Sequence, residues 1–306
     1  MLAIVAAPDT KEGFTFRDVP APQPGPTEAL VDVNAISLNR GEANRLSVAE
    51  PDWRPGWDFS GVVRRAARDG RGPAEGQRVV GIVPEGSWAQ QVAVSTDRVA
   101  TLPDQVSFAD AATLPVAGLT ALRTLRFGGL LLGRRAVITG AAGGVGRLAV
   151  QLASQAGAYV IAIVGSSERA SGLDRLGAAE TVLGIDRISE PAHLILESVG
   201  GESLAAALKL VAPHGCVVSF GNSSRQDTSF NVSEFYTHDD AQLRAFLLLD
   251  PDQAPFTDDL SALASLVAVR KLSPEIGLET SWRHLAEALK ALRERKVNGK
   301  AVLTVA

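Results

Sequence analysis

Glycines gathered at residues 140–146 are the part of this sequence whose type and spacing could bind a phosphate. A short β-branched run at 136–139 precedes them, and a stretch of helical composition follows at 147–156. A tight glycine turn that opens a helix offers unpaired N–H groups and the positive end of the helix dipole, with no side chains to keep a pyrophosphate away. The spacing Ala141-x-Gly143-x-x-Gly146 is the dinucleotide fingerprint with alanine at its first position. The sequence therefore predicts a pyrophosphate held by the backbone of Gly143, Gly144, Val145 and Gly146.

The residues after the second strand of such a fold indicate which dinucleotide it binds. A fold that prefers NAD usually ends this strand in Asp or Glu, which binds the ribose 2′-hydroxyl. Here the strand ends at Val164 and Gly165, followed by two serines, Glu168 and Arg169. Because a 2′-phosphate requires donors and positive charge, we expect Ser166 and Arg169 to bind it and NADPH to be the cofactor. The alternative is that Arg169 lies on a solvated helix face while Glu168 turns toward the ribose.

The elements that must position these residues change character near Ala109. Residues 1–110 contain short β-type runs broken by proline and glycine, as in a small barrel-like β domain. Further on, longer helices and strands alternate, which indicates a parallel sheet with right-handed crossovers. The expected helices follow the first strand, the second strand and Gly201. The expected strands are 136–139, 159–164, 193–197 and 216–220.

Two connections in this order are informative. Residues 184–192 contain Pro191 and are too few for a helical crossover, so we expect a loop there. Near the end of the chain, 260–269 and 284–295 have helical patterns, and 301–305 has the composition of a strand of the first domain. The sequence therefore predicts a chain that leaves a β domain, builds a nucleotide fold and returns.

Composition sets limits on the class of protein. The 306 residues are 46% hydrophobic and 21% charged, which is typical of a globular chain long enough for two domains. A net charge of −4 does not favour nucleic acid or a membrane surface as a partner, and no apolar run reaches the length of a membrane helix. The single cysteine, Cys216, fits a buried position in a reducing cytosol. We expect a cytoplasmic protein whose first residues form a strand rather than a signal peptide.

Seven short motifs follow one another in the order of a known family. They are residues 37–42, 55–62, 76–81, 112–121, 140–146, 197–201 and 295–300. Together they resemble the zinc-independent, quinone oxidoreductase-like branch of the medium-chain dehydrogenase/reductase superfamily over nearly the whole chain. The resemblance implies an α/β protein with a Rossmann nucleotide-binding domain (parallel sheet) at 114–255 and a GroES-like β-barrel domain split between 1–113 and 256–306. It also implies NADPH as hydride donor and a homodimer joined through the nucleotide domains.

The first domain lacks the side chains that related enzymes use for zinc. Zinc alcohol dehydrogenases of this superfamily carry a ligand-bearing Gly-His-Glu motif where this sequence has Gly56, Trp57 and Asp58. Residues 1–113 contain neither cysteine nor histidine. A catalytic zinc needs three protein ligands, so we predict no metal site. Residues 238–240, His-Asp-Asp, are expected to form a polar loop.

The resemblance assigns residues after two later strands to the cofactor. It implies that Ser198 and Val199 line the adenosine side. Phe220, Gly221 and Asn222 follow the next strand and are expected to approach the nicotinamide from the carboxyl edge of the sheet, where ligands of such folds bind.

Three more cofactor contacts are implied outside that edge. Thr120 is expected to pack against the nicotinamide, with a buried helical threonine as the alternative. Asn298 and Lys300 match a C-terminal cofactor contact in the family, and the alternative for Lys300 is a surface charge.

The catalytic candidates are Asn39 and Glu42, at the family's Asn-x-x-Asp position with glutamate in place of aspartate. If they begin a short helix, their spacing puts both on one face, where Asn39 could donate to the cofactor or to a substrate carbonyl. The alternative is a turn-capping Asn39 and a structural Glu42 paired with Arg45 or Arg40. The tyrosine that many relatives place after this segment is missing, which leaves Tyr236 or water as the proton donor.

Without a Lewis acid, the acceptor should be one whose reduction needs little polarisation. Quinones and conjugated enones fit, because the charge spreads onto a distant oxygen, whereas a simple ketone develops an alkoxide. The sequence therefore predicts an NADPH-dependent quinone or enone reductase. The alternatives are a carbonyl or imine reductase of secondary metabolism and an NADPH-binding protein without turnover.

Overall fold

The computed structural model describes residues 1–305, which form two compact α/β units. Unit 1 combines residues 1–119 with the C-terminal residues from Leu249 onward, and unit 2 is Thr120–Leu248. The chain leaves one unit, builds the other and returns. We expected the nucleotide domain to span residues 114–255. In the structure, residues 114–119 and 249–255 belong to unit 1 instead. The first boundary shifts because residues 114–118 pack on strands of unit 1.

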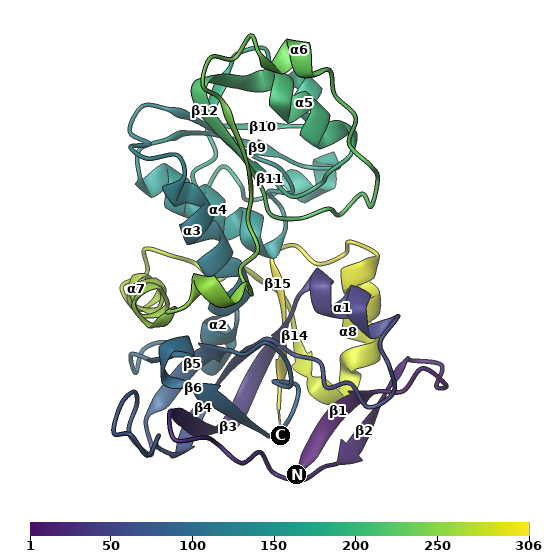
Figure 1. Ribbon diagram of the computed structural model, residues 1–306, viewed down its shortest axis with the longest axis vertical. Helices are drawn as coiled ribbons and strands as arrows, with labels where there is room; N and C mark the ends of the chain where they lie inside the picture. The colour runs from purple at the N-terminus through teal and green to yellow at the C-terminus, as the bar shows by residue number, and fades with distance from the viewer. Residues whose placement is uncertain (306) are drawn as a thin grey trace. The chain divides into compact units, whose positions relative to one another are not determined.

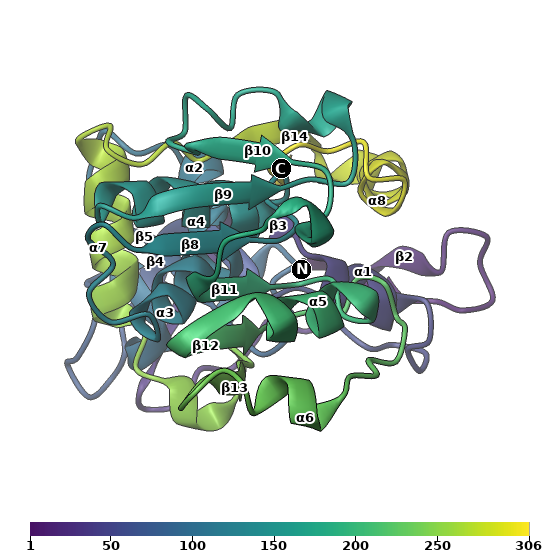
Figure 2. The same ribbon diagram turned by 90° about the horizontal axis from the view of Figure 1, so that it is seen from above.

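Unit 2 is built on a parallel sheet with the strand order β10-β9-β8-β11-β12-β13, and Figure 2 shows these strands side by side. The order reverses between β8 and β11, so the carboxyl ends of these two strands flank the switch point at which Rossmann folds bind ligands. The strands are β8 (Arg135–Ile138), β9 (Tyr159–Ile163), β10 (Glu180–Val182), β11 (Ala192–Glu197), β12 (Val211–Ser219) and β13 (Gln242–Ala245).

Helices cover both faces of this sheet. Helix α4 packs on β8 and β9, and α5 packs on β11 and β12. The connection from β8 through α4 to β9 and the connection from β11 through α5 to β12 run in opposite directions along the sheet. Because both connections are right-handed, the two helices lie on opposite faces, as Figure 2 shows. The helices of unit 2 are α4 (Gly144–Gln155), α5 (Glu202–Leu210), α6 (Val232–Phe235) and, across its boundary, α3 (Leu119–Arg126).

Two connections of unit 2 test the sequence predictions. The predicted helix after β9 is wrong, because only a 3-10 turn, η3 (Ser167–Ala170), forms there before a series of turns. Gly172, with a φ of +81°, lies in those turns in a conformation that no right-handed helix contains. The predicted loop at 184–192 is confirmed, with one 3-10 turn, η4 (Ile185–Arg187).

Unit 1 is built on a curved, mainly antiparallel sheet with the order β14-β15-β3-β4-β5-β7, in which β6 also pairs with β3. Figure 1 shows the C-terminal strand β15, in yellow, beside β3, in purple. A separate hairpin, β1–β2, completes it. The strands are β1 (Leu2–Ala6), β2 (Phe14–Asp18), β3 (Glu28–Leu38), β4 (Asp58–Arg65), β5 (Arg78–Ile82), β6 (Gln91–Ser95), β7 (Val99–Thr101), β14 (Ile276–Ser281) and β15 (Lys300–Thr304).

The helices of unit 1 close the sheet around an apolar core that includes the fully buried Phe59, Trp88 and Trp282. None of the helices within residues 1–305 is long and apolar enough to cross a membrane. The helices are α1 (Arg40–Leu46), α2 (Phe108–Ala112), the π-helix η2 (Leu114–Gly118), α7 (Thr257–Ala268) and α8 (Leu285–Arg293), with 3-10 turns η1 (Thr96–Arg98), η5 (Pro251–Gln253) and η6 (Trp282–His284).

Candidate active site

The glycine turn of unit 2 connects β8 to α4 at the switch point. Gly140 has a φ of +60°, and its carbonyl oxygen accepts a hydrogen bond from Gly143 N at 2.9 Å. Gly143 is the N-cap of α4, so no side chain bonds the first N–H groups of that helix. These N–H groups and the helix dipole are therefore available to an anion, which is the charge that a dinucleotide pyrophosphate carries.

The glycines of the turn have different neighbours. A Cβ on Gly146 would collide with the carbonyl oxygen of Gly140 and with Cα of Ala141, so only glycine lets α4 pack against the turn. A Cβ on Gly143 would meet only the Gly140 oxygen, at 3.2 Å. The space beside Gly143 is thus open apart from that oxygen, whereas the chain itself fills the space beside Gly146. This arrangement fits the cradle of a dinucleotide.

A buried carboxylate links this turn to the next strand end. Glu197, at the end of β11, has no exposed surface, and its carboxylate accepts hydrogen bonds from Val199 N (3.0 Å), Gly200 N (2.9 Å) and Ser203 Oγ (2.9 Å). Thr139, which follows β8, accepts a hydrogen bond from Ser198 N at 2.8 Å. Ser198 and Val199 are therefore held at the carboxyl edge beside the glycine turn.

Residues after β12 join the same edge. Phe220 N donates to the carbonyl oxygen of Glu197 at 3.0 Å, and a Cβ on Gly221 would meet the carbonyl oxygen of Ser198 at 3.1 Å. Asn222 Oδ1 accepts a hydrogen bond from Arg225 N at 3.1 Å, within its own loop. The structure thus brings residues 198–199 and 220–221 together with the turn at the ends of β8, β11 and β12.

The side chains after β9 show a mixed environment for the ribose. Hydrogen bonds from the hydroxyls of Ser166 and Ser167 hold the pKa of the Glu168 carboxyl below its usual range. Glu168 is exposed, and Arg169 in the same 3-10 turn is half-buried. The Ser166 hydroxyl expected to bind a 2′-phosphate therefore bonds a carboxylate, so this turn carries one negative and one positive side chain next to each other.

The catalytic candidates of unit 1 belong to a buried set of polar side chains. We call Ser37, Asn39, Glu42, Asp58 and Lys300 the unit-1 polar cluster. Strand pairing brings these residues together. Ser37 of β3 pairs with Asp58 of β4. Leu38 of β3 pairs with Ala301 of β15, and Lys300 directly precedes Ala301. Ser37, Glu42 and Asp58 have no exposed surface, and Lys300 is 5% exposed.

Glu42 is bonded to main-chain N–H groups rather than to arginine. Asn39 is the N-cap of α1 and its N–H donates to Glu42 Oε2 at 2.8 Å, while Trp57 N donates to Glu42 Oε1 at 2.6 Å. Arg45, one of the two arginines named as alternative partners of Glu42, approaches Glu85 instead, at 3.9 Å. Burial, followed by the nearby charge of Asp58, raises the pKa of Glu42 to about 8.

Lys300 lies inside the unit-1 polar cluster and is not a surface charge. Its Nζ donates to Leu38 O (3.1 Å), Asn39 Oδ1 (2.6 Å) and Asp58 Oδ2 (3.2 Å). Asn298, two residues earlier, precedes Gly299, whose φ of +88° lets the chain turn closely against Glu275 before β15.

The remaining candidates lie elsewhere. Thr120 is 5% exposed in α3, where its carbonyl oxygen accepts a hydrogen bond from Thr124 Oγ1 at 2.7 Å. Tyr236 follows α6 and is 75% exposed. Within residues 1–305, no three His, Cys, Asp or Glu side chains are grouped so that they could hold a metal ion.

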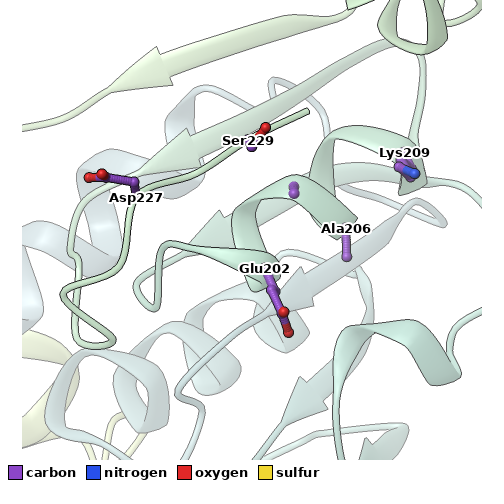
Figure 3. Close-up of a pocket in the computed structure, with 6 residues that line it drawn as sticks. Glu202, Ala206, Lys209, Asp227 and Ser229 are labelled. Carbon is purple, nitrogen blue, oxygen red and sulfur yellow. The ribbon is translucent and has the colours of Figure 1, made fainter. Parts of the chain in front are cut away.

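A hollow of about 440 Å³ lies on unit 2 between α5 and residues 227–229 (Figure 3). None of the candidate residues lines it. Its lining residues are Glu202, Ala205, Ala206, Lys209, Asp227 and Ser229.

Sequence reasoning missed Asp58 and Glu197 as members of the site. Asp58 is the acceptor that joins the strands of the unit-1 polar cluster, and its Oδ1 also accepts from Val116 N at 2.9 Å. The sequence signal for both residues was a single carboxylate at the end of an apolar strand. Burying a carboxylate costs free energy unless the group is hydrogen-bonded or paired with a charge, so such a residue is expected to have partners. Both residues stand within motifs that carried the family resemblance.

Comparison with known proteins gives the family of this fold. Residues 25–104 match the alcohol dehydrogenase GroES-like domain, and residues 144–265 match the family described as zinc-binding dehydrogenase. The quinone oxidoreductase of Pseudomonas aeruginosa is 28% identical over 322 residues, covering 95% of each protein. The solved quinone oxidoreductase of Coxiella burnetii is 29% identical with a TM-score of 0.85, covering 100% of this chain and 99% of that chain.

Two further likenesses concern the fold and the length of the chain. The Escherichia coli quinone oxidoreductase, solved as a complex with NADPH, has the same fold at 22% identity and a TM-score of 0.87, covering 99% of this chain and 100% of that one. The spectinabilin polyketide synthase system protein NorB of Streptomyces orinoci is 32% identical over 292 residues, 92% of this chain, and the chain spans only 13% of its length. Family matches to both domains and similarity over nearly the whole length show that the chain belongs to the medium-chain dehydrogenase/reductase superfamily, in its quinone oxidoreductase-like branch.

Proposed function

We propose that the chain is an NADPH-dependent reductase that transfers a hydride to a quinone or an α,β-unsaturated carbonyl compound. The observation that carries this proposal is the glycine-capped N-terminus of α4 at the switch point of a Rossmann sheet. When bound, the nicotinamide cofactor supplies the hydride. We assign its pyrophosphate to Gly143, Gly144, Val145 and Gly146.

The rest of the cofactor is assigned to residues that the sequence singled out. Ser166 and Arg169 would bind the 2′-phosphate, because a hydroxyl and a guanidinium suit it. The remaining assignments, of adenosine and nicotinamide contacts, are Thr120, Ser198, Val199, Phe220, Gly221, Asn222, Asn298 and Lys300.

The choice of acceptor follows from the groups that could stabilise developing charge. Residues 1–119 contain neither cysteine nor histidine, so this part of the chain has no ligand set for a catalytic zinc. A conjugated acceptor spreads its charge onto a distant oxygen and needs less polarisation than a ketone. We therefore propose a zinc-independent reaction, with Asn39 and Glu42 at the reacting end and Tyr236 or water as the proton donor.

Turnover with a panel of acceptors tests this function. The purified chain should consume NADPH with 1,4-benzoquinone and with an enone such as 3-buten-2-one, and should leave cyclohexanone and a cyclic imine unreduced. Turnover with the ketone or imine alone would replace this function with a carbonyl or imine reductase. Tight NADPH binding without oxidation by any acceptor would favour a binding protein. The homodimer and the cytoplasmic location stay predictions.

A further inference from the structure

Arg147 connects the two segments of unit 2 that are assigned to the phosphate groups of the cofactor. It follows Gly146 in the first turn of α4, and its backbone N–H donates to Gly143 O at 2.9 Å. Its guanidinium reaches a different segment, since Nη2 donates to the carbonyl oxygen of Ser171 at 2.7 Å. Ser171 is the C-cap of η3, the 3-10 turn that contains Arg169. One buried residue, 5% exposed, therefore links the start of α4 to the end of η3.

The segment that Arg147 contacts is a series of turns rather than a helix. Residues 166–178 form short-range hydrogen bonds, of which Leu173 N to Ala170 O at 3.2 Å is one. Leu173 is fully buried and anchors the segment by apolar contact. Because single turns lack the cooperativity of a helix, tertiary contacts decide where such a segment lies. The bond from Arg147 to Ser171 O is one of these contacts.

Gly172 allows guanidinium groups to approach the turn closely. Its φ is +81°, and a Cβ there would lie 3.6 Å from Arg147 Nη1 and 3.1 Å from Arg175 Nη2. The turn that follows η3 thus lies against two arginines, of which Arg147 is buried and Arg175 is exposed. The buried arginine is placed to hold the turn, and the exposed one gives a comparison for the effect of charge.

The two segments that Arg147 links lie at the ends of neighbouring strands. Strands β8 and β9 pair in parallel, and Ala141 N in the glycine turn donates to Ile163 O at the end of β9, at 3.0 Å. NADPH carries its pyrophosphate and its 2′-phosphate on the same adenosine ribose, so the sugar limits the distance between them. A protein that binds both groups gains affinity when its two binding segments are already held at the matching distance.

We propose that Arg147 is a positioning residue that holds η3, and with it Arg169, at the distance from the glycine turn that the 2′-phosphate of NADPH requires. The inference rests on the proposed function in taking NADPH as the cofactor. It concerns how the chain distinguishes NADPH from NADH. Because NADH lacks the 2′-phosphate, a displaced η3 should weaken the binding of NADPH more than that of NADH.

Calorimetric titration with two fragments of the cofactor tests the proposal. Adenosine 2′,5′-bisphosphate carries the 2′-phosphate and adenosine 5′-monophosphate lacks it, so the ratio of their dissociation constants reports on the 2′ position alone. Arg147→Met should lower the preference for the bisphosphate by up to about fivefold, the effect expected for Arg169→Ala, because Arg147 acts through Arg169. The double variant should lose no more than Arg169→Ala. Any effect of the Arg147 charge on the 5′-phosphate is common to both fragments and leaves the ratio unchanged.

Matched variants separate positioning from charge and from folding. Arg175→Met removes an exposed guanidinium from beside the same glycine while the bond to Ser171 O stays, and the ratio should not change, because solvent screens an exposed charge. If Arg147→Met does not fold, Gly172→Ala takes its place. It strains the turn through its positive φ without removing a charge, and it should lower the same preference.

The possible results have distinct meanings. Equal losses in Arg147→Met and Arg175→Met would overturn the proposal in favour of a general effect of positive charge. An unchanged ratio in a folded Arg147→Met variant, or losses that multiply in the double variant, would also overturn it. A chain that shows the expected ratios but oxidises NADPH with no acceptor would support the inference and contradict the proposed reductase.

Discussion

Side chains that follow β9 carry opposing preferences for the ribose 2′ position. Arg169 provides positive charge, whereas Glu168 is an exposed carboxylate whose pKa is held below its usual range by the hydroxyls of Ser166 and Ser167. A carboxylate accepts a hydrogen bond from the 2′-hydroxyl of NADH and repels the 2′-phosphate of NADPH. The proposed preference for NADPH would therefore be set by the difference between two neighbouring charges, and we expect it to be modest.

Removing either charge should move the preference in opposite directions. Glu168→Gln should raise the ratio of kcat/KM for NADPH to that for NADH about fivefold, the effect of about 1 kcal/mol between charges 4 Å apart in water. Arg169→Ala should lower the ratio by a similar factor. Steady-state kinetics with both cofactors measure it.

An exposed arginine gives the matched control for these two variants. Arg187→Ala removes a guanidinium that lies 3.8 Å from Asp186, and the ratio should not change. If Arg169→Ala left the ratio unchanged as well, the 2′-phosphate would have to be bound by other residues.

At the scale of elements, the β8–α4 turn uses its glycines for two separate purposes. Gly146 lets the helix approach the turn, because a Cβ there would meet backbone atoms of Gly140 and Ala141. At Gly143 a Cβ would meet only the Gly140 carbonyl oxygen, at 3.2 Å, which is a milder contact than those at Gly146, so we propose that its lack of a side chain serves the ligand. Alanine substitution at Gly143 and at Gly146 can therefore distinguish an effect on cofactor binding from an effect on the packing of α4.

Alanine at these positions should produce different defects. Gly143→Ala should raise the Kd for NADPH at least about tenfold, because the methyl group occupies the space of the pyrophosphate, while the melting temperature changes little. Gly146→Ala should lower the melting temperature by several degrees, in keeping with a loss of about 1–3 kcal/mol from overpacking. Thermal unfolding without cofactor and NADPH titration measure the two effects. Equal losses of stability in both variants would contradict the assignment.

The parts of the site that were predictable from the sequence are those made by neighbouring residues. The turn at 140–146 is local, since strand, glycines and helix follow one another within about two dozen residues. The helix expected after β9 failed on an equally local signal, Gly172, whose left-handed φ belongs to a turn. The unit-1 polar cluster was not predictable, because Lys300 and Asp58 are 242 residues apart and meet only through the register of β15, β3 and β4.

At the scale of the whole molecule, the unit-1 polar cluster makes stability depend on pH. It buries two carboxyl groups, Glu42 and Asp58, against one ammonium, Lys300. Desolvation and the Asp58 charge raise the pKa of Glu42 from 4.5 to about 8 in the folded chain, whereas Lys300 and the N–H groups of Asn39 and Trp57 act in the opposite direction. Between these two values the folded chain holds a proton that the unfolded chain has released. Stability from this group is therefore complete below pH 4.5 and is lost as the pH rises to about 8.

The comparison of wild type with Glu42→Gln isolates that contribution. All four tryptophans, at 53, 57, 88 and 282, lie in unit 1, so their fluorescence during urea unfolding reports on the unit that contains Glu42. From pH 5 to pH 8, the free energy of unfolding of the wild type should fall by about 3 kcal/mol more than that of Glu42→Gln. Glutamine also loses a hydrogen bond to Trp57 N or Asn39 N, and this lost bond lowers the variant's free energy of unfolding by an amount that does not depend on pH. That constant loss does not alter the slope. Parallel stability curves for the two proteins would show that Glu42 stays ionised in the folded chain, with Lys300 and the main-chain N–H groups outweighing its burial.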